Sequence, residues 1–426
     1  YLLLLSVSVL ITIGILFIYS SGMNADGILV TNEYRKQIIF ASAGIVLLLV
    51  MTFLDYRKFR EWSPWLFTGA VLLLVYTRLF GRYVNGAKSW IGIGELGIQP
   101  SEFMKIIFIL FLARYLEKSR KKDSERRRFI ISLCILLLPM ALIFAQPDLG
   151  TATVYIPIFL AMCFVAGAPV RYLGIVLGCG TCTIIFMVLP LWEGNIARKS
   201  IPLVNLLTDE RLRLITIAAL SSITFISLIG RMIMKKSYYY WIAYISGILT
   251  FAVVASFGAG RILKEYQIMR LIVFLDPNID PLGSGWNIIQ SITAIGSGGL
   301  TGLGFLQGTQ SHYNFLPQQS TDFIFSILSE EWGFAGVLSV FGLFAIIFIR
   351  GIVILRYTSD PYGYYIAAGI IFMIFYHFII NVGMVMGIMP ITGIPLLFLS
   401  YGGSSLWTAL IAVGILMSIN LRCMDY

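Results

Sequence analysis

Residues 315–336 read FLPQQSTDFIFSILSEEWGFAG, an apolar helical pattern that carries three carboxylates. The acids are Asp322, Glu330 and Glu331. A charge at the bilayer centre costs about 2.5–3.5 kcal/mol on insertion scales, so acids in membrane helices usually face a cavity or a partner. This stretch therefore indicates a membrane helix whose acids serve either its packing or its chemistry.

Helical geometry separates the three acids. Successive residues of a helix are rotated by about 100°, which places Ser326 near the face of Asp322. Glu330 lies to one side of that face, and Glu331 points roughly opposite. Asp322 would then sit at the outer mouth of a span, above a polar stripe. Two structural alternatives stay open: Asp322 is the N-cap of the helix, and the two glutamates pair with basic groups.

The rest of the chain is equally apolar. Of its 426 residues, 58% are hydrophobic and only 12% are charged, whereas soluble domains carry about 25% charged residues. The apolar residues form runs of roughly 20, the length of a transmembrane helix. Helices also satisfy their own backbone hydrogen bonds in lipid. We therefore predict an all-α fold, a polytopic helical membrane bundle that forms a single domain over residues 1–426.

The apolar runs predict about twelve spans. The first run opens the sequence, and we interpret it as a span rather than a signal peptide because no cleavage site is convincing and further spans follow. The predicted spans are at about residues 1–20, 37–54, 64–80, 102–116, 129–145, 152–168, 171–190, 213–230, 239–257, 323–349, 364–385 and 402–420.

The net charge of +10 follows the predicted topology. Basic residues fall in short loops that alternate along the chain, which is the positive-inside pattern. We therefore predict that both termini are cytoplasmic, and we interpret the charge as topology rather than as affinity for nucleic acid. The basic loops contain Arg57, Lys58 and Arg60, then residues 117–128, then Arg231, Lys235 and Lys236, then Arg350 and Arg356, and finally Arg422.

Three outward-facing segments have too many apolar residues to be simple loops. They are residues 80–102, 258–321 and 387–405. Long structured loops are usually functional, and irregular backbone at membrane depth is tolerated only where protein or a water-filled cavity lines it. We expect these segments to be partly buried, and we interpret 258–321 as a large extracytoplasmic loop before the Asp322 helix.

Further polar residues lie at the outer ends of predicted spans. Gln146 and Asp148 lie in AQPDLGT at the outer end of the fifth predicted span, where proline and glycine break the helix. Glu102 and Lys105 are three residues apart, a spacing that allows an ion pair. That pair either holds two helices together or helps to line a polar cavity open to the outer leaflet.

The large outward-facing loop carries cations against the positive-inside bias. Arg261, Lys264 and Arg270 lie there, and we interpret them as a sign of an anionic ligand. The Gly-rich run GSGGLTGLGFLQG follows. It either presents backbone N–H groups to an anion or packs closely against membrane helices.

An outer carboxylate, nearby cations and a lipid-accessible cavity suit the transfer of a sugar from a lipid diphosphate to a hydroxyl. One carboxylate can act as the base toward the acceptor hydroxyl. Cations or a divalent metal offset the charge on the departing diphosphate, and direct displacement inverts the anomeric centre. A lipid transporter would also use a polar cavity with a cationic mouth, so the residues alone leave both functions open.

Six motifs, in chain order, resemble the SEDS family (shape, elongation, division and sporulation). The similarity extends over nearly the whole chain, and the tail NVGMVMGIMPITGIPLLFLSYGGSS is more similar to the RodA, or elongation, branch than to the FtsW or SpoVE branches. The motifs are GAKSWIGIGELGIQPSE, QPDLGT, YQIMRLIVFLDPNIDPLGSGWNIIQS, GSGGLTGLGFLQGTQ, LPQQSTDFIFSILSEEWG and GIPLLFLSYGGSS.

The resemblance implies a peptidoglycan glycosyltransferase of cell elongation in the bacterial inner membrane. Such an enzyme polymerises lipid II into glycan strands and releases undecaprenyl diphosphate. A class B penicillin-binding protein would supply transpeptidation, within the elongation machinery. The resemblance also implies support by a divalent cation, Mg²⁺ or Mn²⁺, although no set of metal ligands is legible in the sequence. Two alternatives stay open: a lipid II flippase and a non-catalytic scaffold for the penicillin-binding protein.

The family motifs imply roles for individual residues. The essential acid of the TDFIF motif falls on Asp322, which becomes the candidate general base. The functional tryptophan of the first large outer loop falls on Trp90, and a shifted positive charge falls on Lys88. The full set of candidate substrate-binding residues is Trp90, Lys88, Glu102, Lys105, Asp148, Arg270, Gln290 and Ser326.

The sequence also departs from the family pattern. Gln318 and Ser320 stand where the family usually has an acid and a histidine, which places more weight on Asp322. Most members have ten spans, whereas the pattern predicts that residues 191–262 of this chain insert an extra helix pair. We expect that pair to preserve the topology.

Overall fold

A computed structural model describes residues 1–84, 87–93, 96–197, 201–262, 265–283, 285–313 and 315–423. The fold divides into two compact units. The first unit contains residues 1–168 and 290–426, and the second contains residues 169–289.

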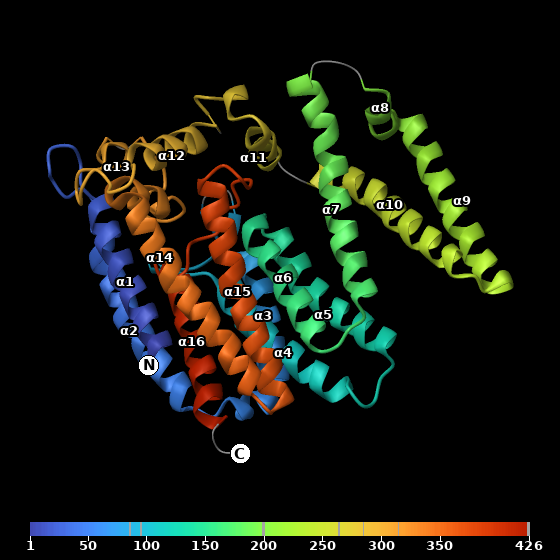
Figure 1. The fold of residues 1–426 in the computed structure, drawn as a ribbon, viewed down its shortest axis with the longest axis horizontal. Coiled ribbons are helices and arrows are strands. Elements are labelled where there is room, and N and C mark those ends of the chain that lie inside the picture. The colour runs from blue at the N-terminus through green and yellow to red at the C-terminus, as the bar shows by residue number, and fades with distance from the viewer. Residues whose placement is uncertain are drawn as a thin grey trace. The chain divides into compact units, whose positions relative to one another are not determined.

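The first unit is a helical bundle (Figure 1). Within it, α2 packs against α16, α1 against α14, α3 against α4, and α15 against both α4 and α6. Helices from the two ends of the chain are therefore neighbours. The long helices of this unit are α1 (Leu2–Ser21), α2 (Glu33–Phe53), α3 (Phe59–Phe80), α4 (Pro100–Ser119), α5 (Glu125–Ala145), α6 (Leu149–Val165), α14 (Ile324–Tyr357), α15 (Pro361–Val385) and α16 (Gly403–Arg422).

The second unit contains three long helices with short connecting elements. Helices α9 and α10 form a hairpin, and Lys235 turns the chain between them in a left-handed conformation with φ of 53°. Helix α10 also packs against α7. Within the described part of α9, only Ser227 is buried. The elements are α7 (Val170–Trp192), a π-helix (Glu193–Ala197), α8 (Pro202–Thr208), α9 (Glu210–Met234), α10 (Ser237–Ile262), α11 (Glu265–Leu275) and a 3₁₀ turn (Pro277–Ile279).

Each of the twelve predicted spans coincides with a helix. Ten helices in the described part of the chain are long and apolar enough to cross a membrane. Helix α6 is apolar but shorter, with 17 residues. The prediction of an all-α, multi-pass membrane bundle is confirmed, whereas the insertion of residues 191–262 stays a prediction.

A small antiparallel sheet follows α3, in a segment where the sequence analysis predicted only a structured loop. Its strands are β1 (Arg82–Val84), β2 (Ala87–Ile93) and β3 (Leu96–Ile98), in the order β1-β2-β3. The sequence held a signal that we missed. An Asn-Gly pair separates the first two strands, and this dipeptide between alternating apolar residues is typical of a hairpin.

Shorter helices connect the second unit to α14. Helix α12 (Trp286–Ser297) crosses the boundary between the units, and α13 (Thr309–His312) follows the Gly-rich run. In that run, Gly298 and Gly302 lie against the backbone of α14, where a Cβ on either would overlap carbonyl groups of the helix. The Gly-rich run therefore packs closely against a membrane helix, as one of the two interpretations predicted.

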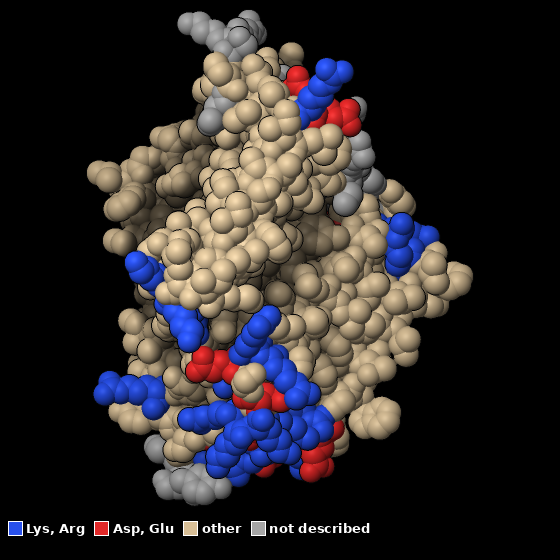
Figure 2. Space-filling view, turned by 90° about the vertical axis from the view of Figure 1, so that its right-hand side faces the viewer, with Lys and Arg blue, Asp and Glu red and all other residues tan. Residues whose placement is uncertain are grey.

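Exposed Lys and Arg side chains gather at one end of the surface shown in Figure 2. Within the first unit, the connection between α4 and α5 is rich in such residues. A cluster of this kind beside membrane helices is expected on the cytoplasmic side. The exposed cations of this connection are Lys118, Arg120, Lys121, Lys122, Arg126 and Arg127.

Helix α14 is kinked at Gly333, whose φ of 60° and ψ of −161° are not helical. This region of φ and ψ is essentially restricted to glycine. A Cβ at Gly333 would also overlap the backbone of Thr301 and Gly302. The kink therefore lets the Gly-rich run pass across the helix beside Glu330 and Glu331.

We predict that Gly333→Ala destabilises the protein by about 1–3 kcal/mol, because alanine cannot adopt this conformation without strain. Thermal unfolding of the detergent-solubilised protein measures the loss. Gly342→Ala is the matched control on the same helix, since a Cβ there meets nothing within 4 Å. Equal melting temperatures for the two variants would contradict the role assigned to Gly333.

Candidate active site

Asp322 lies in a tight turn immediately before α14. The carbonyl oxygen of Gln318 accepts hydrogen bonds from the N–H groups of Thr321 and Asp322, both at 3.2 Å. Gln318 itself has a left-handed φ of 51°. Phe323 occupies the N-cap position of α14, so Asp322 precedes the cap and the interpretation of Asp322 as the N-cap is wrong.

The side chain of Asp322 lies beside the connection between α15 and α16. A Cβ built on Gly393 would be 3.5 Å from Oδ2 of Asp322. Gly393 has a positive φ of 70°, which lets the chain turn next to the carboxylate. The amide of Asn381 donates to the backbone oxygen of Asp322 at 3.0 Å and to that of Ile394 at 2.8 Å. Asn381 thus joins the Asp322 turn to this connection.

Glu102 and Lys105 form the predicted ion pair, with Nζ of Lys105 2.8 Å from Oε1 of Glu102. Both side chains are buried, at 1% exposed for Lys105 and 4% for Glu102. The ammonium also lies 3.1 Å from Nε2 of His377. This pair therefore joins α4 to α15, in agreement with the structural alternative for these residues.

Asp148 caps the start of α6. Its Oδ1 accepts from the N–H of Thr151 at 3.2 Å, and its Oδ2 accepts from the Thr151 hydroxyl at 2.9 Å. Gln99, just before α4, donates to Oδ2 at 2.7 Å. Burial raises the pKa of Asp148, and the hydrogen bonds from Thr151 act against that shift. Asp148 thus ties the start of α4 to the start of α6.

The Asp148 turn also reaches the connection beside Asp322. A Cβ on Gly150 would overlap the carbonyl oxygen of Thr392, so only glycine allows this approach. Residues 392–395 therefore touch the Asp148 turn at Thr392 and lie beside Asp322 at Gly393. The structure thus brings Asp322 and Asp148 beside the same short segment. His377 links the Glu102–Lys105 pair to that segment at Pro395.

Trp90 and Lys88 both lie on β2. The ring of Trp90 covers Gly97 on the neighbouring strand, where a Cβ would be 2.8 Å from the indole. The ammonium of Lys88 donates to the carbonyl of Leu79 at 2.6 Å, which satisfies a carbonyl at the end of α3. Trp90 is half-buried, so part of the residue remains accessible.

The glutamates of α14 have partners other than those expected. Oε1 of Glu330 accepts from the N–H and the hydroxyl of Thr309, both at 2.8 Å. Glu331 accepts from the hydroxyl of Ser20 and from the N–H of Leu306. The prediction that these acids pair with basic groups is therefore wrong, because in the described structure they bind backbone and hydroxyl donors that fix the Gly-rich run.

The remaining candidates occupy different settings. Ser326 is fully buried, with its hydroxyl 2.9 Å from that of Ser291, so the predicted polar stripe is closed by packing here. Gln290 is half-buried on α12. Arg270 lies on α11 in the second unit. Lys264 and the side chain of Arg261 lie outside the described residues. The substrate-binding roles of all these residues stay predictions.

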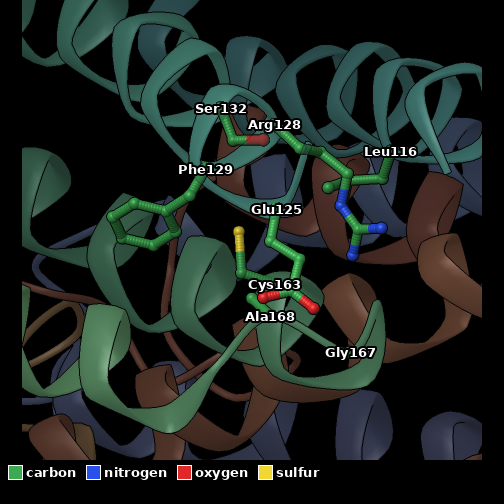
Figure 3. Close-up of a pocket in the computed structure, with 8 residues that line it drawn as sticks. All are labelled: Leu116, Glu125, Arg128, Phe129, Ser132, Cys163, Gly167 and Ala168. Carbon is green, nitrogen blue, oxygen red and sulfur yellow. The ribbon is translucent and has the colours of Figure 1, made fainter. Parts of the chain in front are cut away.

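No group of three or more His, Cys, Asp or Glu side chains in the described residues could hold a metal ion. A small cavity of about 10 Å³ lies elsewhere, between the far ends of α4, α5 and α6. Glu125, Arg128 and Cys163 point into it (Figure 3). This cavity is too small for a sugar or a lipid headgroup.

Comparison with known proteins places this architecture in a family. The model of the cell cycle protein family of FtsW, RodA and SpoVE matches residues 1–201 and 197–423. The chain belongs to this family. It is the SEDS family that the sequence motifs predicted.

Curated SEDS relatives match over most of their length. The peptidoglycan glycosyltransferase RodA of Treponema pallidum (strain Nichols) is 54% identical over 99% of this chain and 97% of its own. The stage V sporulation protein E of Bacillus subtilis (strain 168) is 36% identical over 98% and 96%. The peptidoglycan glycosyltransferase MrdB of Escherichia coli (strain K12) is 32% identical over 88% and 82%.

Solved structures share the SEDS fold. One chain, from work described as "Structural coordination of polymerization and crosslinking by a peptidoglycan synthase complex", has a TM-score of 0.70 at 22% identity and covers 100% of this chain and 98% of its own. The rod shape determining protein RodA of Thermus thermophilus has a TM-score of 0.59 at 21% identity, over 99% and 96%. At sequence identities of 21–22%, the similarity to these structures shows only that the fold is shared.

Sequence reasoning did not identify His377 or Asn381 as parts of the site. Both are buried on α15 and bind the segment beside Asp322. The available signal was His377 itself, an ionisable residue inside a predicted span, because such residues usually have a named partner. Its partners lie far away in the sequence, so no local pattern identifies them.

We predict that Lys105→Ala destabilises the protein by about 3–5 kcal/mol, because it leaves Glu102 charged and buried without its cation. The double variant Glu102→Gln, Lys105→Met should recover much of this loss. Arg127→Ala is the control, since Arg127 is 70% exposed in its pair with Asp123 and surface pairs contribute about 1 kcal/mol or less. If Arg127→Ala lowers the melting temperature as much as Lys105→Ala does, this explanation is excluded.

Proposed function

We propose that this chain is a peptidoglycan glycosyltransferase that polymerises lipid II during cell elongation, with Asp322 as the general base. The names of the Treponema and Escherichia relatives support the activity. The position of Asp322 supports its role: the carboxylate lies beside Gly393, in a turn held by Asn381 through the backbone. A base must be placed within hydrogen-bond reach of the proton it removes, and this turn provides a fixed place.

The reaction forms one bond and breaks another. Asp322 accepts the proton of an acceptor sugar hydroxyl as that oxygen bonds to the anomeric carbon of the donor. The bond from the anomeric carbon to the diphosphate breaks, and undecaprenyl diphosphate leaves with the electron pair. Attack opposite the leaving group inverts the anomeric centre. No general acid is required, because the diphosphate is already a good leaving group.

Cations would stabilise the departing diphosphate. Lys88 is a candidate for that contact if substrate displaces its bond to the Leu79 carbonyl. Arg270 stays a candidate on the sequence alone. Lys105 is buried against Glu102 and His377, which suits a role in holding the site rather than in touching substrate. Trp90, half-buried on β2, would contact the sugar.

A divalent cation, Mg²⁺ or Mn²⁺, would depend on the substrate for most of its ligands. The described residues offer no cluster of three His, Cys, Asp or Glu ligands. Mg²⁺ commonly binds through one or two carboxylates together with substrate phosphates and water. The ion would supply charge neutralisation for the diphosphate, and Asp322 is the residue placed to share it.

We further propose a class B penicillin-binding protein as the partner that cross-links the strands, within the elongation machinery of the bacterial inner membrane. The similarity of the fold to a chain of a peptidoglycan synthase complex supports an assembly of this type. The twelve predicted spans, an even number, would leave both termini on the same side of the membrane, and the positive-inside pattern makes that side the cytoplasm.

Asp322→Ala is expected to abolish polymerisation, because no other carboxylate of the site is placed to replace the base. Purified protein is incubated with lipid II, with and without Mg²⁺ or Mn²⁺, and glycan strands are resolved on a gel. Leaflet exchange of lipid II without strands would indicate a flippase, and neither activity would indicate a scaffold. Substantial strand synthesis by a folded Asp322→Ala protein would exclude the catalytic assignment.

Trp90→Ala is expected to reduce polymerisation by about tenfold or more through lost substrate positioning. Its thermal melt should stay close to that of the wild type, because the tryptophan is only half-buried and lies on a small sheet. Tyr83→Ala, on the neighbouring strand, controls for general damage to that sheet. A collapsed melt for Trp90→Ala would show that the tryptophan is structural.

A further inference from the structure

A buried polar connection crosses the candidate site along one face of α15. His377 and Asn381 are four residues apart, a spacing that places them on the same face of a helix. His377 is 1% exposed and Asn381 is 0% exposed. Each binds the backbone of the connection between α15 and α16, His377 at Pro395 and Asn381 at Ile394. Two adjacent carbonyls of that connection are therefore held by two side chains of one helix.

One end of this connection reaches the candidate base. The amide nitrogen of Asn381 has two protons, and it donates one to Ile394 and the other to the backbone oxygen of Asp322. Gly393, the residue before Ile394, lies beside the Asp322 carboxylate. A shift of residues 393–395 would therefore displace Asp322 directly.

The other end reaches the buried ion pair. A carbonyl oxygen can only accept a hydrogen bond, so Nδ1 of His377 carries the proton and donates to the carbonyl of Pro395 at 3.1 Å. Nε2 is then an acceptor for the ammonium of Lys105, 3.1 Å away. The orientation of the imidazole is fixed from both sides, and Lys105 is fixed in turn by Glu102.

We propose that His377 is a positioning residue that transmits the placement of the Glu102–Lys105 pair to Asp322 through residues 393–395. The inference rests on the proposed function. Pro395 has no N–H group and Gly393 turns the chain with a positive φ, so regular secondary structure does not hold this segment. Its position depends on the side chains that bind its carbonyls. Displacing a reacting group by about 1 Å can cost about 100-fold in rate.

The test compares two replacements of His377 in the lipid II polymerisation assay. His377→Phe keeps the volume but loses both hydrogen bonds, and kcat should fall by about 100-fold while KM stays near the wild-type value. His377→Gln keeps an acceptor for Lys105 and a donor for Pro395, so it should retain most of the wild-type kcat. A purely structural histidine would not produce this selective loss of kcat and its rescue by glutamine.

Tyr362→Phe is the matched control. Tyr362 is buried on the same helix, and its hydroxyl has no hydrogen-bond partner in the described structure. This variant should therefore polymerise lipid II at the wild-type rate. If His377→Phe loses its cooperative thermal melt, His377→Asn replaces it, because the shorter amide cannot reach Lys105 and Pro395 together and should show the same loss of kcat.

A double-mutant cycle tests the link to Lys105. If Lys105 acts on Asp322 through His377, then Lys105→Met adds little to the loss of kcat in His377→Phe. If the kcat losses of the two single variants multiply in the double variant, the link is overturned. A wild-type kcat in His377→Phe would also overturn it, as would a kcat in His377→Gln as low as that of His377→Phe. If the wild-type protein makes no glycan strands, the proposed function is refuted. The assay therefore distinguishes failure of the proposed function from failure of the positioning role of His377.

Discussion

The irregular backbone between α15 and α16 must have its polar groups satisfied, and this requirement organises the first unit. Buried N–H and C=O groups without partners are costly, and a membrane interior offers no water to replace them. Side chains from distant helices meet the requirement. His377 and Asn381 bind carbonyls on one side, and Gln37 of α2 binds the carbonyl of Ser400 and the N–H of Gly402 on the other. The segment is thus fixed between helices from both ends of the chain.

Close packing adds to these hydrogen bonds. A Cβ on Gly14 of α1 would overlap the carbonyls of Phe398 and Leu399, and one on Gly150 would overlap that of Thr392. The absence of side chains at these two positions lets α1 and the start of α6 approach the segment directly. The candidate site is consequently assembled from turns that are far apart in sequence, and each turn is positioned by contact with the same backbone.

The sequence predicted the features that depend on local patterns. Apolar runs located the twelve longest of the α-helices that the structure describes but not the short α8, α11, α12 and α13, and the spacing of Glu102 and Lys105 predicted their ion pair. The predicted break at Pro147 is confirmed, since α5 ends at Ala145, but Asp148 caps the start of α6, which begins earlier than predicted. The partners of Glu330 and His377 could not be predicted in this way, because Thr309 and Lys105 approach them only through tertiary packing. The sheet around Trp90 was missed although its Asn-Gly turn signal was local.

The buried cation and the candidate base are held by different groups. The ammonium of Lys105 is engaged by Glu102 and His377, while the turn that carries Asp322 is held at its backbone by the neutral amide of Asn381. Asn381 therefore fixes the Asp322 turn, whereas Lys105 supplies the buried positive charge. Lys105 is committed to the scaffold, so the positive charge that a departing diphosphate needs would come from other cations or with the substrate.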